Sequence, residues 1–179
     1  MGYGRLNGIP KEVPYLDILR AVGESQFLRT RPLGIPSDDA QQATLLAITA
    51  ERNRSGWDEM STRMWANNLI RATRANIWRG YGKMFKQSVD NLVRGHGYRV
   101  SGTNSAGIGA AMRSGPLGII YSLNLDSLRV ATIESSLVTH RDVRAVAIAY
   151  ANTWLVYAFL NDFSYFLARL SKLFGCEQQ

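Results

Sequence analysis

Hydrophobic residues recur at helical spacing along most of the chain after residue 37. In residues 57–73, Trp57, Met60 and Met64 follow the i, i+3, i+7 pattern of one helix face, and Trp65 and Leu69 lie four apart. Similar periods predict helices over 38–53 and 80–94. No segment has the apolar and polar alternation of a half-buried strand. We therefore predict an all-α protein, a compact orthogonal bundle of roughly six to eight helices.

A longer helix is expected after residue 142, and a further helix after that one. The stretch AVAIAYANTWLVYAFL is the most apolar of the chain, but it is shorter than a typical membrane span and contains Asn152 and Thr153. We interpret it as a buried core helix, with a membrane anchor as the alternative. Its inner face is expected to carry Val143, Ala147, Tyr150, Trp154 and Tyr157, and the next helix to bury Phe163, Leu167, Leu170 and Phe174.

The first 36 residues differ in composition from the rest. They hold four of the five prolines and many glycines, with no sustained period. We predict an irregular lead-in over residues 1–36, with one short helix at VPYLDILRAVG, and one helical domain over 37–175. A chain of 179 residues can bury such a core without disulfides or a structural metal.

The net charge of +7 is confined to one region. Residues 52–99 contain ten Lys and Arg against three acidic residues, which accounts for the whole excess. Aromatic residues are interleaved with these cations, as in proteins that bind nucleic acid by phosphate contacts and base stacking. We favour the alternative, a solvated basic face over an aromatic core, and expect nucleic-acid binding to be unimportant.

Cellular location is indicated only by composition. The single cysteine, Cys176, cannot form an internal disulfide, which fits a reducing compartment. The first residues lack the apolar core of a secretory signal. A cytoplasmic location is expected.

Two adjacent carboxylates, Asp38 and Asp39, follow Ser37 at the predicted start of a helix. A serine can cap a helix with its hydroxyl, and acids in the first turn meet the positive end of the helix dipole. The same oxygen donors are those that Mg²⁺ or Mn²⁺ prefers. On local grounds the helix cap is favoured over the metal site.

A glycine-rich segment, SGTNSAGIGAAMRSGPLGIIY, occupies residues 101–121. Gly102, Gly107 and Gly109 would let a ligand approach the backbone, and AAMR favours a helix directly afterwards. A glycine loop at a helix N-terminus can bind phosphate groups. The spacing is not that of a P-loop, so ATP hydrolysis of that type is excluded. Close helix packing is the alternative use of these glycines.

Thr139, His140 and Asp142 form the third segment of interest. Thr139 with Asp142 has the form of a capping box, which would place His140 in the first turn of the long helix, where its ring could donate to an anionic ligand. An ordinary partly buried histidine is the alternative. His96, in a Gly-flanked turn, is interpreted as structural. The chain has no nucleophile elbow and no zinc-type cluster of Cys and His.

Taken in order, these segments resemble the ADP-ribosylglycohydrolase family, all-helical enzymes of the dinitrogenase-reductase-activating glycohydrolase type. SDDAQQATLLA is similar to that family's Thr-Asp-Asp-Thr-Gln segment, and GIGAAMRSGPLGIIY to its loop Gly-x-Gly-Ala-Ala-Met-Arg followed by Pro-Leu-Gly. SSLVTHRDVRAVAIAYA resembles its Thr-His helix start. The resemblance covers residues 37 to about 160, and the glycine loop is its most specific part.

The resemblance implies a role for each matched residue. Ser37, Asp38 and Asp39 correspond to ligands of a dinuclear Mg²⁺ or Mn²⁺ centre, and the two aspartates to catalytic residues. In the substrate site, Ser105, Gly107 and Gly109 correspond to the loop around the ADP-ribose phosphates and His140 to a residue near the ligand. Such enzymes hydrolyse the bond from the ribose anomeric carbon to a modified side chain.

The chain departs from the family pattern at both ends. Residues 1–36 lack the opening Gly-Asp-Ala helix, with Glu24 as a weak substitute, and no Asp-x-Asp-Thr follows the Thr-His helix, where the only acids are Asp162 and Glu177. We therefore expect a truncated member with half of the metal site and weak or lost metal binding. Hydrolysis, non-catalytic binding of ADP-ribose or a partner protein, and completion of the site by a second subunit all stay open.

Overall fold

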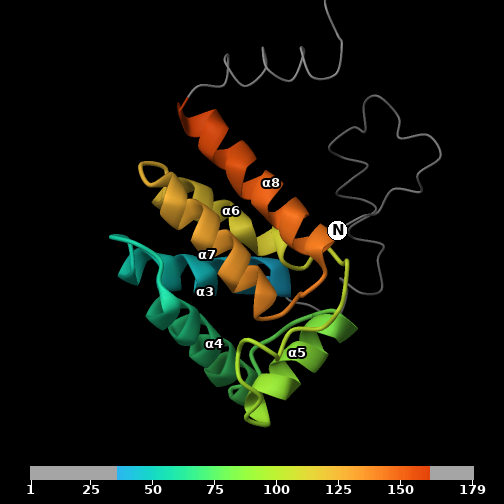
Figure 1. The fold of residues 1–179 in the computed structure, drawn as a ribbon. Coiled ribbons are helices and arrows are strands. Elements are labelled where there is room, and N and C mark those ends of the chain that lie inside the picture. The colour runs from blue at the N-terminus through green and yellow to red at the C-terminus, as the bar shows by residue number, and fades with distance from the viewer. Residues whose placement is uncertain (1–35, 162–179) are drawn as a thin grey trace, which may run out of the picture. The chain divides into compact units, whose positions relative to one another are not determined.

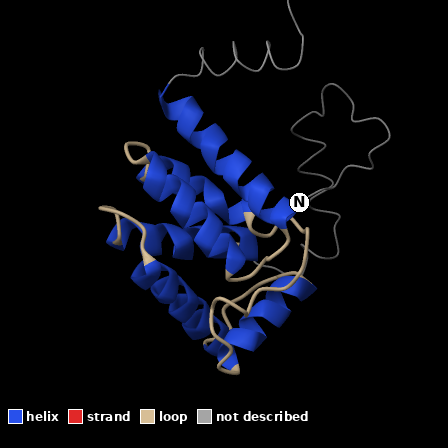
Figure 2. Ribbon diagram, viewed as in Figure 1, coloured by secondary structure: helices blue, strands red, loops and turns tan. Residues whose placement is uncertain are grey.

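The structure, a computed structural model, describes residues 36–161, and every regular element in that range is a helix (Figures 1 and 2). The only pairing of strand type in this range is an isolated bridge between Thr103 and His140. The prediction of an all-α fold is confirmed. The helices are α3 (Asp38–Arg52), α4 (Glu59–Arg74), α5 (Lys83–Val93), α6 (Ala111–Ile120), α7 (Leu125–Leu137) and α8 (Val143–Asn161).

Local sequence accounts for several helix ends. Asp58 caps α4, since its carboxylate accepts from the backbone N–H of Ser61 at 2.8 Å while the Ser61 hydroxyl accepts from the Asp58 N–H, completing a capping box. α5 is followed by Gly95 at φ +91°, a backbone conformation that favours glycine. The predicted end of this helix at the GHG sequence is confirmed.

α7 is not predicted as a separate helix from the sequence pattern. Its buried face carries small hydroxyl side chains instead of an apolar stripe, including Ser127, Thr132, Ser135 and Ser136. Thr132 and Ser136 donate to backbone carbonyls four residues back, at 2.7 and 2.6 Å, so these buried hydroxyls are satisfied within the helix. Hydrophobic periodicity does not predict a helix whose buried face is polar.

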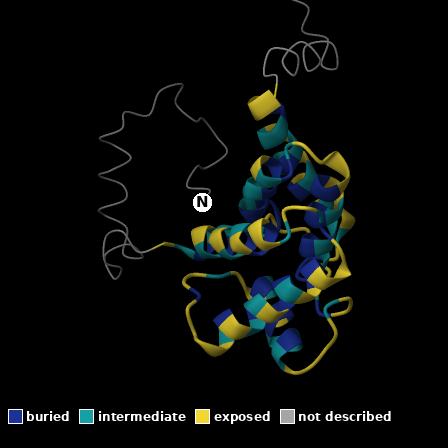
Figure 3. Ribbon diagram, turned by 90° about the vertical axis from the view of Figure 1, so that its left-hand side faces the viewer, coloured by how far each residue is buried: buried dark blue, intermediate teal, exposed yellow. Residues whose placement is uncertain are grey.

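The main core gathers apolar side chains from α3 to α7. Trp65, Leu69 and Leu46 are fully buried there, and buried residues line the faces that the helices turn toward one another (Figure 3). The predicted burial of Met60 is wrong, because it is 64% exposed. α4 begins only at Glu59, so Trp57 precedes the helix and does not fix its periodicity.

α8 lies across α6 and α7 (Figure 1). It buries a narrow strip of small residues, Ala145, Ala149, Thr153 and Ala158. The strip fits α6 because Gly118 lies so close that a Cβ there would be 2.5 Å from the Thr153 carbonyl oxygen. Small residues on both helices thus replace the usual interdigitation of large side chains.

The predicted inner face of α8 is wrong for Val143, which is 78% exposed, and for Ala147, which is also exposed. Tyr150 and Tyr157 are partly buried and pack against the main core, and Trp154 is partly buried. The close approach to α6 requires small residues at the contact, and this turns the larger apolar ones outward. α8 is the one described helix that is long and apolar enough to cross a membrane, a criterion that core helices also meet.

Several predictions fall on residues 1–35 and 162–179, outside the described range. These are the short helix at VPYLDILRAVG, the helix carrying Phe163 to Phe174, and the candidate acids Glu24, Asp162 and Glu177. The domain boundaries stay predictions.

Candidate functional site

The segment Ser37–Asp39 lies at the start of α3, as predicted. Ser37 occupies the N-cap position, but its side chain makes no capping hydrogen bond, and only its carbonyl accepts from Gln41 N at 3.0 Å. Asp38 is buried, with 8% of its surface exposed, and Asp39 is half-buried. The interpretation of Ser37 as a side-chain cap is therefore wrong, whereas both acids do sit in the first turn, at the positive end of the helix dipole.

A buried glutamine holds the Asp38 carboxylate. The side chain of Gln42, one turn further along α3, donates from Nε2 to Asp38 Oδ2 at 3.1 Å. The other end of the same amide, Oε1, accepts from Arg113 Nη1 at 2.9 Å. Because Gln42 is fully buried, its amide connects Arg113 on α6 to the Asp38 carboxylate away from the protein surface.

Arg113 is a fully buried cation on α6. It donates from Nη2 to the Ser135 carbonyl at 3.1 Å and to Thr139 Oγ1 at 2.5 Å, and its guanidinium carbon lies 5.3 Å from the centre of the Trp65 ring. It forms no ion pair with any described residue, and its Nε has no hydrogen-bond partner there. Burial lowers the pKa of Arg113 to about 9, so it stays charged at neutral pH.

Thr139 and His140 precede α8, and a bridge to the glycine-rich segment fixes their backbone. The Thr139 carbonyl accepts from Thr103 N at 3.1 Å, and the Thr103 carbonyl accepts from Arg141 N at 2.8 Å. The Thr139 hydroxyl lies 2.9 Å from His140 Nδ1. His140 is 3% exposed, and burial together with the nearby Arg113 charge lowers its pKa to about 4. The imidazole is therefore neutral at physiological pH.

The predicted capping box between Thr139 and Asp142 is wrong. α8 begins at Val143, and Asp142 alone acts near its start, accepting from the backbone N–H of Arg144 at 2.9 Å. Thr139 points into the core, toward Arg113. His140 therefore lies before the helix and not in its first turn.

The glycine loop lies directly against His140. A Cβ on Gly109 would approach both Cε1 and Nε2 of that ring to 2.8 Å, so only glycine fits this position without displacing the imidazole. Gly107 is exposed, and its N–H donates to Ser105 Oγ at 3.2 Å. The loop leads into α6, as AAMR predicted, and the Met112 N–H in the first turn of that helix donates to the Ile108 carbonyl at 3.0 Å.

The structure thus joins the three predicted segments through side chains that the sequence did not single out. A continuous series of buried hydrogen bonds runs from Asp38 through Gln42, Arg113 and Thr139 to His140. The one available signal was an arginine in the otherwise apolar helix AMRSGPLGII. Asp39 and Ser37 have no such described connection to the loop.

The described residues do not complete a metal centre. Within residues 36–161, no group of three or more His, Cys, Asp or Glu side chains is arranged to hold a metal ion. Asp38, Asp39 and Ser37 supply oxygen donors of the right kind from one segment, but one Asp38 oxygen already accepts from Gln42. A dinuclear magnesium centre needs more oxygen ligands than these.

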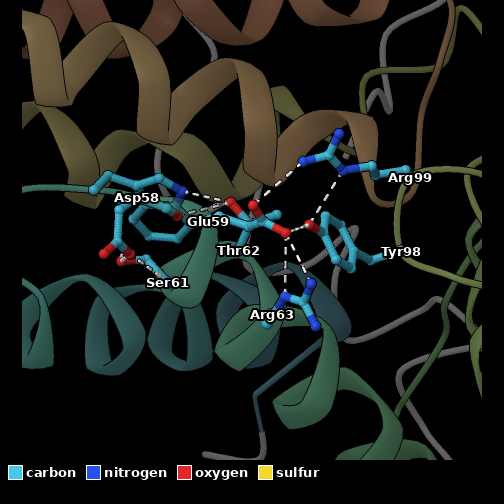
Figure 4. Close-up of polar contacts among 8 residues, drawn as sticks. Asp58, Glu59, Ser61, Thr62, Arg63, Tyr98 and Arg99 are labelled. Carbon is cyan, nitrogen blue, oxygen red and sulfur yellow. Dashed lines mark hydrogen bonds and ion pairs between the residues drawn. The ribbon is translucent and has the colours of Figure 1, made fainter.

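The basic region uses its aromatic residues in the core. Trp57, Trp65, Trp78 and Phe85 are all buried, which leaves them unable to stack on bases. On the surface, Glu59 is hydrogen-bonded to Arg63 at 2.8 Å and Tyr98 at 2.9 Å, and ion-paired with Arg99 at 3.5 Å (Figure 4). These contacts favour the solvated basic face over a nucleic-acid interface.

Comparison with known protein families gives a match. The family model described as ADP-ribosylglycohydrolase matches residues 5–174. The comparison with curated proteins gives no match. The matched range includes the whole described part of the chain.

Proposed function

Because the chain belongs to the ADP-ribosylglycohydrolase family, we propose that it binds ADP-ribosyl groups beside the glycine loop and His140. The observation that carries this proposal is the contact of Gly109 with the His140 ring, which leaves no room for a side chain. The free ligand would be ADP-ribose, and the macromolecular ligand an ADP-ribosylated protein. The resemblance to the dinitrogenase-reductase-activating type and a cytoplasmic location belong to the same proposal.

The chemistry of the loop suits a pyrophosphate. The exposed backbone around Gly107 precedes α6, whose N-terminal end presents the positive end of a helix dipole to anionic oxygens. Ser105 supplies a hydroxyl next to that backbone, bonded to Gly107 N. His140, neutral by burial, adds a ring donor without adding charge. In this proposal the loop contributes most of the affinity for the ligand, and His140 orients the bound ligand.

We propose that this chain alone binds Mg²⁺ or Mn²⁺ weakly and hydrolyses ADP-ribosyl bonds poorly or not at all. Asp38 and Asp39 come from a single turn of one helix, whereas a dinuclear centre needs anionic oxygens from several segments. Under this proposal, the series of hydrogen bonds from Asp38 to His140 holds the residues of the binding site in place.

The second candidate function is metal-dependent hydrolysis with ligands from elsewhere. The family match extends over residues 5–35 and 162–174, which contain Glu24 and Asp162, and so favours keeping this candidate. A second subunit could supply acids in the same way. Under this candidate, Asp38 and Asp39 are catalytic as well as metal-binding.

Isothermal titration with ADP-ribose, with and without Mg²⁺, tests the proposal. Wild type should bind, with an affinity that changes little on addition of Mg²⁺. Gly109→Ala should weaken binding at least tenfold, about 1.4 kcal/mol, because the added methyl group displaces the His140 ring. Gly97→Ala is the matched control, since a Cβ there meets nothing within 4 Å, and it should bind as wild type does.

Absence of ADP-ribose binding by the folded wild-type chain would overturn the proposal. Equal affinities for wild type and Gly109→Ala, with folding checked by circular dichroism, would place the ligand elsewhere.

A further inference from the structure

The direction of the hydrogen bonds around Thr139 has a consequence for His140. Arg113 can only donate, so at the 2.5 Å contact Thr139 Oγ1 is the acceptor. The hydroxyl keeps one proton to donate. Two acceptors lie within reach, His140 Nδ1 at 2.9 Å and the Ser136 carbonyl at 3.4 Å.

The His140 ring nitrogen is the better acceptor of that proton. The Ser136 carbonyl already accepts from the backbone N–H groups of Thr139 and His140, at 3.0 and 2.8 Å, and the hydroxyl contact with it is long. The charge of Arg113 polarises the hydroxyl and makes it a stronger donor. The opposite arrangement would direct an Nδ1–H toward an oxygen that already accepts from a cation.

We infer that Arg113, acting through the Thr139 hydroxyl, holds His140 in the neutral tautomer that carries its proton on Nε2. Arg113 and Thr139 are thereby positioning residues for this histidine. The two residues form a directed series in which the guanidinium donates to the hydroxyl and the hydroxyl donates to the imidazole.

Nε2 is also the nitrogen that faces the loop. A Cβ on Gly109 would lie 2.8 Å from it, and among the described residues it has no hydrogen-bond partner, although the ring is 3% exposed. An N–H at this nitrogen, beside the loop, is available to an acceptor oxygen of a ligand, of the phosphate or ribose hydroxyl class. This assignment of the ligand atom rests on the proposed function, whereas the tautomer does not.

The tautomer can be read from the nitrogen resonances of the imidazole in the full chain at neutral pH. The protein has two histidines, and His140→Gln identifies the signals of His140. We expect a protonated, pyrrole-type Nε2 and an unprotonated, pyridine-type Nδ1 in wild type. The exposed His96 gives an internal reference that should not change in any variant.

Three variants test this series of hydrogen bonds. Thr139→Val removes the hydroxyl at nearly constant shape, and Arg113→Met removes the donors at similar length. In each, the Nδ1–H tautomer of His140 should appear. Thr139→Ser keeps the hydroxyl and should restore the wild-type pattern, which a purely structural role of Thr139 would not require.

Three results would overturn the inference. They are an Nδ1–H tautomer in wild type, an imidazolium in wild type, and an unchanged Nε2–H tautomer in Thr139→Val or Arg113→Met. If ADP-ribose does not bind but the tautomer follows this pattern, only the proposed function fails.

Discussion

Burial of an arginine side chain carries a desolvation penalty, and the groups around Arg113 offset it. Three acceptors and the face of Trp65 surround its guanidinium, while no carboxylate of the described residues neutralises it. A buried positive charge favours the neutral or anionic forms of nearby titratable groups. It therefore disfavours a second positive charge on His140, in the same direction as burial of that ring.

The depressed pKa of His140 gives the stability of the protein a pH dependence. The ring protonates near pH 6.5 in the unfolded chain but only near pH 4 in the folded one, so between these values the unfolded state binds one proton more. The free energy of unfolding should therefore fall as the pH is lowered through this window, by up to about 3 kcal/mol from this group.

Urea unfolding at about pH 7 and about pH 4.5 measures this effect. Wild type should lose more stability between the two conditions than His140→Gln, which has no ring to protonate. The variant also corrects for the carboxylates that titrate in the same range. Equal losses in the two proteins would contradict the burial of a neutral His140.

At the scale of elements, the contact between α6 and α8 is set by glycine and small residues. Gly118 and Gly115 both lie on α6, but only Gly118 meets the backbone of α8 closely. A Cβ at Gly118 would approach the Thr153 carbonyl oxygen to 2.5 Å and Val156 Cβ to 2.9 Å. At Gly115 the nearest atoms would be 3.8 and 4.0 Å away, which is ordinary contact.

Alanine substitutions at these two glycines should therefore differ in their effect on the free energy of unfolding. Gly118→Ala should lower the free energy of unfolding by about 2 kcal/mol or more, because α8 must move away. Gly115→Ala should leave it unchanged or raise it by up to about 1 kcal/mol, since alanine favours a helix interior. Urea denaturation measures both, and a Gly118→Ala variant as stable as wild type would refute the close packing.

The contact between α6 and α8 illustrates the difference between what the sequence pattern predicts and what tertiary packing decides. Hydrophobic periodicity located α3, α4 and α5, whose buried faces include the apolar residues Leu46, Leu69 and Leu92. It failed for the buried hydroxyl face of α7 and for the orientation of α8, where fit to Gly118 outweighs hydrophobicity. Asp38 and His140, the two ends of the hydrogen-bond series, lie in segments that the sequence pattern indicates. Gln42 and Arg113 connect those segments through tertiary contacts, which no local pattern encodes.

At the scale of the whole molecule, the described residues combine a well-connected proposed ligand site with a sparse set of metal donors. The loop, His140 and Asp38 are linked through buried hydrogen bonds, while residues 36–161 contain no arranged group of three metal-ligating side chains. Ligand binding and hydrolysis, which the family resemblance implies together, are therefore expected to be separate properties in this protein. Binding of ADP-ribosyl groups is expected, and their efficient hydrolysis is not.

A release assay on ADP-ribosylated protein, in the presence of Mg²⁺ or Mn²⁺, tests this separation most directly. Wild type, Asp38→Ala and Asp39→Ala should all release ADP-ribose no faster than the background, because two adjacent carboxylates do not complete a dinuclear centre. All three proteins should remain folded. Robust release by wild type that either substitution abolishes would contradict the account, and would assign the remaining ligands to Glu24, Asp162 or a second subunit.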